Sequence, residues 1–157
     1  MSKVSRTRRE VFDVAGVLVG AAAFSVASAP ARAQATASSE LETTNLKLIN
    51  DFCGSWSTHD HARIMAFFSD NPAYRQTERV EPTIGRQAVS DKIAGFLMNV
   101  VKFEVHESWV RGPMVINERT DYFTGGRLQW WHGVGVFLVK DGKIVEWYDY
   151  TIELKLA

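Results

Sequence analysis

Cysteine is nearly absent from this sequence of 157 residues, in which the one thiol belongs to Cys53. A single cysteine cannot form a disulfide within the chain, and it cannot build a cysteine-based metal site. Basic residues do not recur in blocks beyond the N-terminus, and 18 Lys and Arg balance 18 Asp and Glu. We therefore expect no nucleic-acid partner, because proteins that bind nucleic acid carry a basic surface.

Long apolar runs are also missing, except near the N-terminus. There "MSKVSRTRRE" precedes the small and apolar "VAGVLVGAAAFSVASAPA", which is followed by "ARAQA". This order is typical of an export signal, and Arg8 with Arg9 resembles the pair of a twin-arginine signal. The apolar stretch is too short and too rich in Ala and Ser to predict a membrane span. We expect cleavage after Ala33 or Ala35, a periplasmic or secreted protein, and no stable membrane span after cleavage. An ordinary secretory signal or an uncleaved anchor is the alternative.

The chain is thus divided into an export signal at 1–35 and one domain at 36–157. Within the domain, apolar residues first recur at helical spacing and later alternate with polar ones. Helices are predicted at 38–56, 58–70 and 85–100, a strand followed by a turn at 71–82, and strands at 102–112, 114–123, 127–139 and 143–154. The expected N-caps are Ser38 or Ser39 for the first helix and Thr58 or Asp60 for the second. "TGGR" and "KDGK" are expected to be hairpin loops. This pattern predicts an α+β fold, with three helices packed on one face of a curved, mostly antiparallel sheet.

The segment "VINERTDYF" at 115–123 is unusual for a strand. One face of its alternation carries Asn117, Arg119 and Asp121, whereas a strand normally turns one face to an apolar core. Because side chains alternate along a strand, Arg119 and Asp121 share a face. Either they face water, or they form the floor of a pocket.

Five short motifs resemble one known family. They are "YRQ" at 74–76, "IGRQAV" at 84–89, "ERTD" at 118–121, "GVF" at 135–137 and "WYDY" at 147–150. From Leu46 to Glu153 the sequence resembles the limonene-epoxide hydrolases, which belong to the SnoaL-like superfamily with its nuclear-transport-factor-type cone fold. The resemblance implies a cone with an internal pocket, an enzyme without a cofactor, and a homodimer formed through the sheet.

The resemblance also implies the roles of particular residues. Asp149 would be the base, Asp121 the acid, and Arg119 the bridge between them. Tyr74 matches the tyrosine of the family, and Gln76 stands where the family has Asn, so an amide is kept on a longer side chain. These two would hold the attacking water beside Asp149. The implied reaction is a one-step attack of water on a small or medium apolar epoxide to give a vicinal diol.

Chemistry explains why such a site needs two acids and an arginine. Opening an epoxide with water needs a base that takes a proton and an acid that gives one. Two neighbouring carboxylates in a poorly solvated site share one proton, and an Arg balances the remaining charge. Two other interpretations stay open. The three residues could be a buried ion-pair cluster that only stabilises the sheet, or the protein could be an exported SnoaL-like isomerase, cyclase or non-catalytic binding protein.

The hairpin lengths decide which residue lies between Arg119 and Asp149. Three-residue loops would place Gly133 opposite both, leaving an empty position over which the arginine could reach ~9.6 Å, at ~4.8 Å per strand. Two-residue loops would instead place His132 opposite Arg119 and Val134 opposite Asp149. The glycines of this strand could equally serve only to bend the sheet.

The remaining candidates for a functional role have weaker support. We expect Gly133, Trp131, Phe123 and Phe96 to line the pocket, although such aromatic residues also occur in an ordinary core. No metal site is predicted, because "HDH" at 59–61 offers two ligands without an evident third. His132 is expected on the face away from the pocket, and Cys53 is expected in the core.

Overall fold

The computed structural model describes residues 29–157, with side chains from Ser38 onward. The predicted signal, with Arg8 and Arg9, lies mostly outside the described residues and stays a prediction. Helix α1 (Ala29–Ser55) begins before the predicted cleavage sites and continues past them without a break. Among the described helices, none combines the length and the apolar character that crossing a membrane requires.

The helical part consists of α1, one 3-10 turn and two shorter helices. They are η1 (Trp56–Thr58), α2 (His61–Met65) and α3 (Arg86–Leu97). The predicted cap at Asp60 is confirmed, since its side chain accepts a hydrogen bond from the backbone N–H of Arg63 at 3.0 Å. The predicted caps at Ser38 and Ser39 are wrong, because both lie inside α1. The predicted helix 58–70 is too long, because residues from Phe68 onward form a strand.

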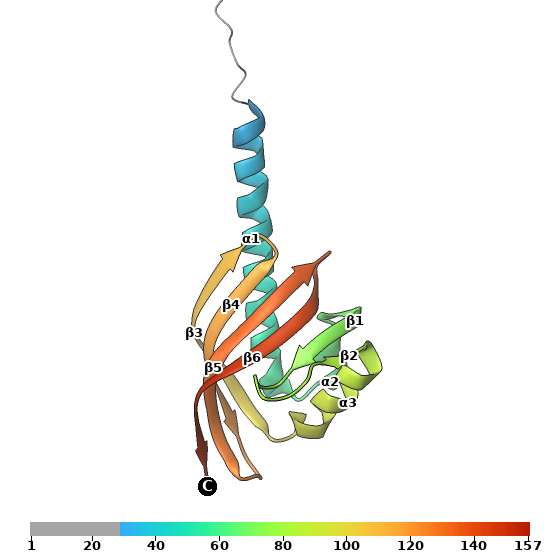
Figure 1. The fold of residues 1–157 in the computed structure, drawn as a ribbon, viewed down its shortest axis with the longest axis vertical. Coiled ribbons are helices and arrows are strands. Elements are labelled where there is room, and N and C mark those ends of the chain that lie inside the picture. Colours follow the sequence, from blue (N-terminus) through green and yellow to red (C-terminus); the bar gives the residue numbers. More distant parts are fainter. Residues whose placement is uncertain (1–28) are drawn as a thin grey trace, which may run out of the picture.

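Six strands form one sheet in the order β2-β1-β6-β5-β4-β3. They are β1 (Phe68–Arg75), β2 (Thr83–Ile84), β3 (Val100–Arg111), β4 (Met114–Phe123), β5 (Leu128–Lys140) and β6 (Lys143–Leu156). Only β1 and β6 pair in parallel, so the predicted curved, mostly antiparallel α+β fold is confirmed. Figure 1 shows long curved strands β3–β6 passing in front of α1, with α2 and α3 beside β1 and β2.

Aromatic side chains fill the space between the sheet and the helices. Phe52 of α1 meets Trp147 of β6 edge to face, with ring centroids 5.2 Å apart. Trp56 stacks on Phe103 of β3 at 4.5 Å. Aromatic pairs of this kind contribute ~0.5–1.5 kcal/mol each beyond the burial of their area. They hold α1 against β6 and η1 against β3, and so help to fix the curvature of the sheet between these strands.

The hairpin between β4 and β5 has the register expected for a three-residue loop. Arg119 lies opposite Gly133, as predicted. The hairpin between β5 and β6 is shorter, because Asp141 and Gly142 alone form its turn, with φ of 51° and 68°. Two consecutive residues with positive φ are what a type I′ turn requires.

The pairing of β5 with β6 then changes along the strands. A register shift between Leu138 and Val139 adds one residue to β6, as a β-bulge does. Asp149 therefore lies opposite Gly135. The predicted pairing of Asp149 with Gly133 is wrong, because it assumed a longer turn and no bulge.

Candidate active site

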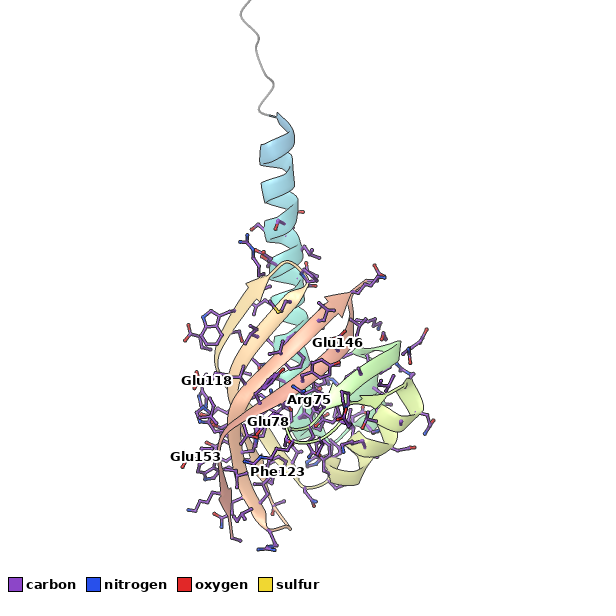
Figure 2. All side chains as sticks on the ribbon, viewed as in Figure 1. Arg75, Glu78, Glu118, Phe123, Glu146 and Glu153 are labelled. Atoms are coloured by element: carbon purple, nitrogen blue, oxygen red, sulfur yellow. The ribbon has the colours of Figure 1, made fainter. Side chains whose placement is uncertain are left out.

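The polar face of β4 points into the interior of the protein. Asn117 and Arg119 have no exposed surface, and Asp121 is 4% exposed. Glu118, between the first two, lies on the opposite side of the sheet, where Figure 2 labels it. A charge buried this deeply is tolerated only when it is paired and hydrogen-bonded. The polar residues of β4 therefore do not face water: Asp121 lines a pocket, and Asn117 and Arg119 are fully buried beside it.

Arg119 is the centre of the polar cluster. Its Nε donates to Oδ1 of Asp121 at 2.9 Å, and its Nη2 donates to Oδ2 of the same carboxylate at 3.2 Å. Nη2 also donates to Oδ1 of Asp149 at 2.9 Å. Nη1 donates to Oδ1 of Asn117 at 3.2 Å. One guanidinium thus links carboxylates from two different strands.

Asp149 comes from β6 and is 4% exposed. Its Oδ1 accepts hydrogen bonds from Arg119 and from Nε1 of Trp147, the latter at 2.7 Å. Its Oδ2 accepts none from the described residues, and Asp149 lines the pocket. One carboxylate oxygen is thus held in place, while the other remains free to accept a hydrogen bond from a bound molecule.

A glycine provides the space that Arg119 occupies, although it is not the glycine that the sequence predicted. A Cβ at Gly135 would stand 2.2 Å from Nη1 of Arg119. A Cβ at Gly133 would instead stand 2.3 Å from both the Trp131 ring and the backbone oxygen of Tyr150. Gly133 is not among the residues that line the pocket. Gly135 has the role that was expected of Gly133, because the two-residue turn and the bulge together shift β6 by two residues.

Burial controls the protonation of the two acids. Desolvation, against the opposing charge of Arg119 and with the help of the charge of Asp149, raises the pKa of Asp121 to about 7. Desolvation also raises the pKa of Asp149 to about 6, against the charge and the hydrogen bond of Arg119. Both acids therefore keep a proton to higher pH than a solvated aspartate does, and two neighbouring carboxyls in such surroundings share one proton.

The space above the acids is a narrow, mostly apolar pocket of about 120 Å³. Of the predicted wall residues, Phe96, Phe123 and Trp131 line it. The complete lining is Tyr74, Gln76, Thr77, Phe96, Phe103, Asp121, Phe123, Leu128, Trp131, Trp147, Asp149 and Leu154. An apolar pocket with few convergent polar groups is typical of a small-molecule site.

The two residues expected to hold a water have different surroundings. Tyr74 is buried and stacks on Trp147 with ring centroids 4.2 Å apart, whereas Gln76 is exposed and reaches the pocket from the loop after β1. Neither side chain hydrogen-bonds to another described residue. The loop is fastened to β6 by Glu78, labelled beside that strand in Figure 2, whose Oε2 accepts from the backbone N–H of Thr151 at 3.1 Å.

Two aromatic residues next to Arg119 were missed at the level of sequence. The guanidinium carbon lies 5.0 Å from the ring centroid of Phe103 and 5.5 Å from that of Trp147. It also lies 5.0 Å from the ring of Trp131, so aromatic faces surround the cation. Strand alternation could have placed Trp147 beside Asp149. Phe103 could be placed only with the register of β3 against β4.

The histidines lie away from this pocket. His132 contacts Glu118 at 2.9 Å on the outer face of the sheet, as expected. His59 and His61 contact the backbone oxygens of Val100 and Ser90. Within residues 29–157, no three His, Cys, Asp or Glu side chains are grouped as metal ligands.

A second, larger space is less suited to chemistry. It is an open groove of about 420 Å³ between α1, α2 and the β5–β6 turn. Its charged residues, among them Lys47, Arg63 and Lys143, are exposed. Of these two spaces, the smaller pocket is the candidate active site, because it combines apolar walls with buried acids.

Comparison with known structures supports the fold. A Mycobacterium tuberculosis epoxide hydrolase of the limonene-epoxide-hydrolase-like type is 24% identical, with a TM-score of 0.62 over 70% of this chain and 84% of that one. A candidate ketosteroid isomerase from Kribbella flavida is 16% identical, with a TM-score of 0.59 over 71% and 80%. A de novo designed protein with a curved β-sheet is 16% identical, with a TM-score of 0.59 over 69% and 85%.

Such different neighbours share an architecture and not one activity. The family assignment comes from the sequence itself, in which residues 49–147 match the SnoaL-like domain. This match includes the floor of the pocket on β4 and Trp147 of β6, and it ends just before Asp149. The chain belongs to the SnoaL-like domain family.

Proposed function

We propose that this protein is a cofactor-free epoxide hydrolase that converts a small or medium apolar epoxide to a vicinal diol. One observation carries the proposal: Arg119 is held between the buried carboxylates of Asp121 and Asp149 at the floor of an apolar pocket. A pocket that only binds apolar molecules has no need of two acids that share a proton.

Asp149 is the base in this mechanism. Its Oδ1 is occupied by Arg119 and Trp147, so its Oδ2 accepts a proton from a water molecule. The oxygen of that water attacks one ring carbon of the epoxide. Holding the water and the epoxide together in a closed pocket lowers the entropic part of the barrier.

Asp121 is the acid. As the new carbon–oxygen bond forms, the bond between the attacked carbon and the ring oxygen breaks. The ring oxygen stays on the neighbouring carbon and takes the proton of Asp121. The products are a diol, a protonated Asp149 and an ionised Asp121. Transfer of one proton from Asp149 to Asp121 restores the starting state, and Arg119 contacts both groups throughout.

Tyr74 and Gln76 have a supporting role in the proposal. Tyr74 lies in the pocket wall against Trp147, close to the base. Gln76 reaches the pocket from its rim, and its amide would bind the water from the side of the loop. We further propose, from the family resemblance, that the protein forms a homodimer through its sheet and is exported by its N-terminal signal.

A SnoaL-like isomerase or cyclase is the second candidate. Buried acids with raised pKa values in an aromatic pocket could also move a proton between two carbons of a bound ketone. The two functions differ in the use of water, since only the hydrolase adds an oxygen atom to its substrate. Mass spectrometry of the product therefore distinguishes them.

The test is turnover of terpene, styrene and fatty epoxides by the purified full chain. We expect diol from at least one of these classes, at the same rate before and after treatment with a chelator. The matched control is Asp149→Asn, which keeps the size of the side chain and removes the base. Folded protein that forms no diol from any of the epoxides would contradict the proposal, and a rate lost with the chelator would require a metal.

A further inference from the structure

Asn117 is the third hydrogen-bond acceptor around Arg119, and the proposed mechanism does not use it. Its side chain has no exposed surface. Its Oδ1 accepts from Nη1 of Arg119 at 3.2 Å, and its Nδ2 donates to Sγ of Cys53 at 3.3 Å. All three guanidinium nitrogens therefore have partners, and Asn117 is the only one of these partners that carries no charge.

The orientation of the Asn117 amide follows from the chemistry of its neighbours. Arginine only donates hydrogen bonds, so the amide must turn its oxygen toward Arg119 and its nitrogen toward Cys53. Cys53 must then accept through its sulfur. Desolvation raises the pKa of this thiol to about 12, so it stays neutral and adds no charge to the cluster.

The sheet leaves room for this contact. Asn117, Gly135 and Asp149 lie opposite one another on three neighbouring strands. A Cβ at Gly135 would stand 2.9 Å from Oδ1 of Asn117 as well as 2.2 Å from Nη1 of Arg119. The amide and the guanidinium therefore meet in the space above the glycine, close to the base.

We propose that Asn117, oriented by Cys53, is a positioning residue that keeps Arg119 shared between Asp121 and Asp149. Asp121 accepts two of the guanidinium hydrogen bonds and Asp149 accepts one. Without the hydrogen bond from Nη1 to Asn117, the guanidinium can turn toward Asp121, which accepts two of its hydrogen bonds. It would then lose its contact with Asp149, the base. The inference rests on the proposed function, since it explains how the acid and the base remain distinct.

Loss of the hydrogen bond from Nη1 to Asn117 should change the pH dependence of the reaction. Contact with Arg119 lowers the pKa of Asp149, so an Asp149 that loses this contact becomes ionised only at higher pH. For Asn117→Leu we expect kcat/KM to fall by roughly 10- to 100-fold. We also expect the acid limb of the pH profile to move up by roughly one pH unit.

Variants of Cys53 test whether this residue orients Asn117, and they leave Asn117 itself unchanged. Cys53→Ala leaves Nδ2 without an acceptor and should move the acid limb in the same direction, while Cys53→Ser supplies a hydroxyl acceptor and should move it back. The matched control is Ser55→Ala on the same helix. It removes another buried polar group, which bonds to the backbone oxygen of Phe52, and should lower stability without changing the pH profile.

Carbon-13 NMR titration of labelled aspartate separates this inference from the proposed function. A higher Asp149 pKa in Asn117→Leu supports the positioning role even if the wild-type protein forms no diol. If Asn117→Leu does not fold, a higher Asp149 pKa in Cys53→Ala supports the positioning role in the same way. If both variants only lose thermal stability, as Ser55→Ala should, while the carboxyl titrations stay unchanged, the proposal is overturned.

Discussion

At the scale of single residues, the cluster around Arg119 has a net charge that depends on one proton. Two ionised aspartates and one arginine leave an excess negative charge in a nearly dry pocket, and a proton on one carboxyl removes it. The unequal surroundings of the two acids determine where that proton resides. Asp121 accepts hydrogen bonds from Arg119 alone, whereas Asp149 also accepts one from Trp147.

The first prediction concerns the two acids. Asp149→Asn removes the base, and Asp121→Asn removes the acid, while each keeps the size of the side chain. We expect either change to lower kcat by roughly 10²- to 10⁴-fold, measured as diol formation at pH 7. Circular dichroism and thermal unfolding serve as controls for the fold. A variant that is folded and retains more than about a tenth of the wild-type rate would exclude the role given to that residue.

The sequence predicted the members of this cluster better than their contacts. Alternation along one strand is enough to place Arg119 beside Asp121, because no distant register is involved. The contact between Asn117 and Cys53 could not be predicted, because it joins α1 to β4 across 64 positions of sequence. The depth of burial also had to come from the structure, since it depends on the packing of α1 over the sheet.

At the scale of elements, the site depends on how β5 lies between β4 and β6. The two-residue turn and the bulge together place Gly135 beneath Arg119. Turn composition could have indicated the short turn, because Asp-Gly is favoured in type I′ turns. The bulge left no comparable signal in the pattern of apolar residues. The predicted partner of Asp149 was therefore wrong by two residues, one from the shorter turn and one from the bulge.

The second prediction uses the two glycines of β5 to test this register. Gly135→Ala places a Cβ against Nη1 of Arg119, so we expect a lower kcat and a changed pH profile. Gly133→Ala meets Trp131 and the backbone of Tyr150, so we expect mainly a loss of stability, of ~1–3 kcal/mol as for other overpacked sites.

The control for this prediction is Gly126→Ala in the β4–β5 loop, where a Cβ would meet nothing within 4 Å. We expect its free energy of unfolding to stay within ~0.5 kcal/mol of the wild type. If Gly133→Ala abolished activity and Gly135→Ala left kcat and the pH profile intact, Arg119 could not lie above Gly135.

At the scale of the whole molecule, the buried acids make stability depend on pH. The pKa values of Asp121 and Asp149 in the folded protein, about 7 and about 6, exceed the ordinary ~3.9 of an unfolded aspartate. The folded protein thus binds more protons than the unfolded chain over this interval, and the free energy of unfolding should fall as pH rises from about 4 to about 7.

This third prediction is measured by urea unfolding at a series of pH values. The contribution of the two acids should be present at low pH and lost above about pH 7, with a size on the order of a few kcal/mol. The double variant Asp121→Asn, Asp149→Asn should lose this part of the slope. An unchanged slope in the double variant would show that the two carboxyls do not titrate as described.

The fold as a whole was accessible from the sequence, because helical spacing followed by alternation is a strong signal for helices packed on an antiparallel sheet. The function was less accessible, since the same cone accommodates several chemistries. The proposed function requires that water, held by Asp149, attacks an epoxide directly.

A single turnover in heavy-oxygen water, with enzyme in excess over epoxide, tests that claim most directly. Water attack predicts one heavy oxygen in the diol formed in the first turnover, and none in Asp121 or Asp149 when their peptides are weighed by mass spectrometry. An aspartate that attacked as a nucleophile would pass its own oxygen to the product. Unlabelled first-turnover diol, with label in either aspartate, would contradict the account.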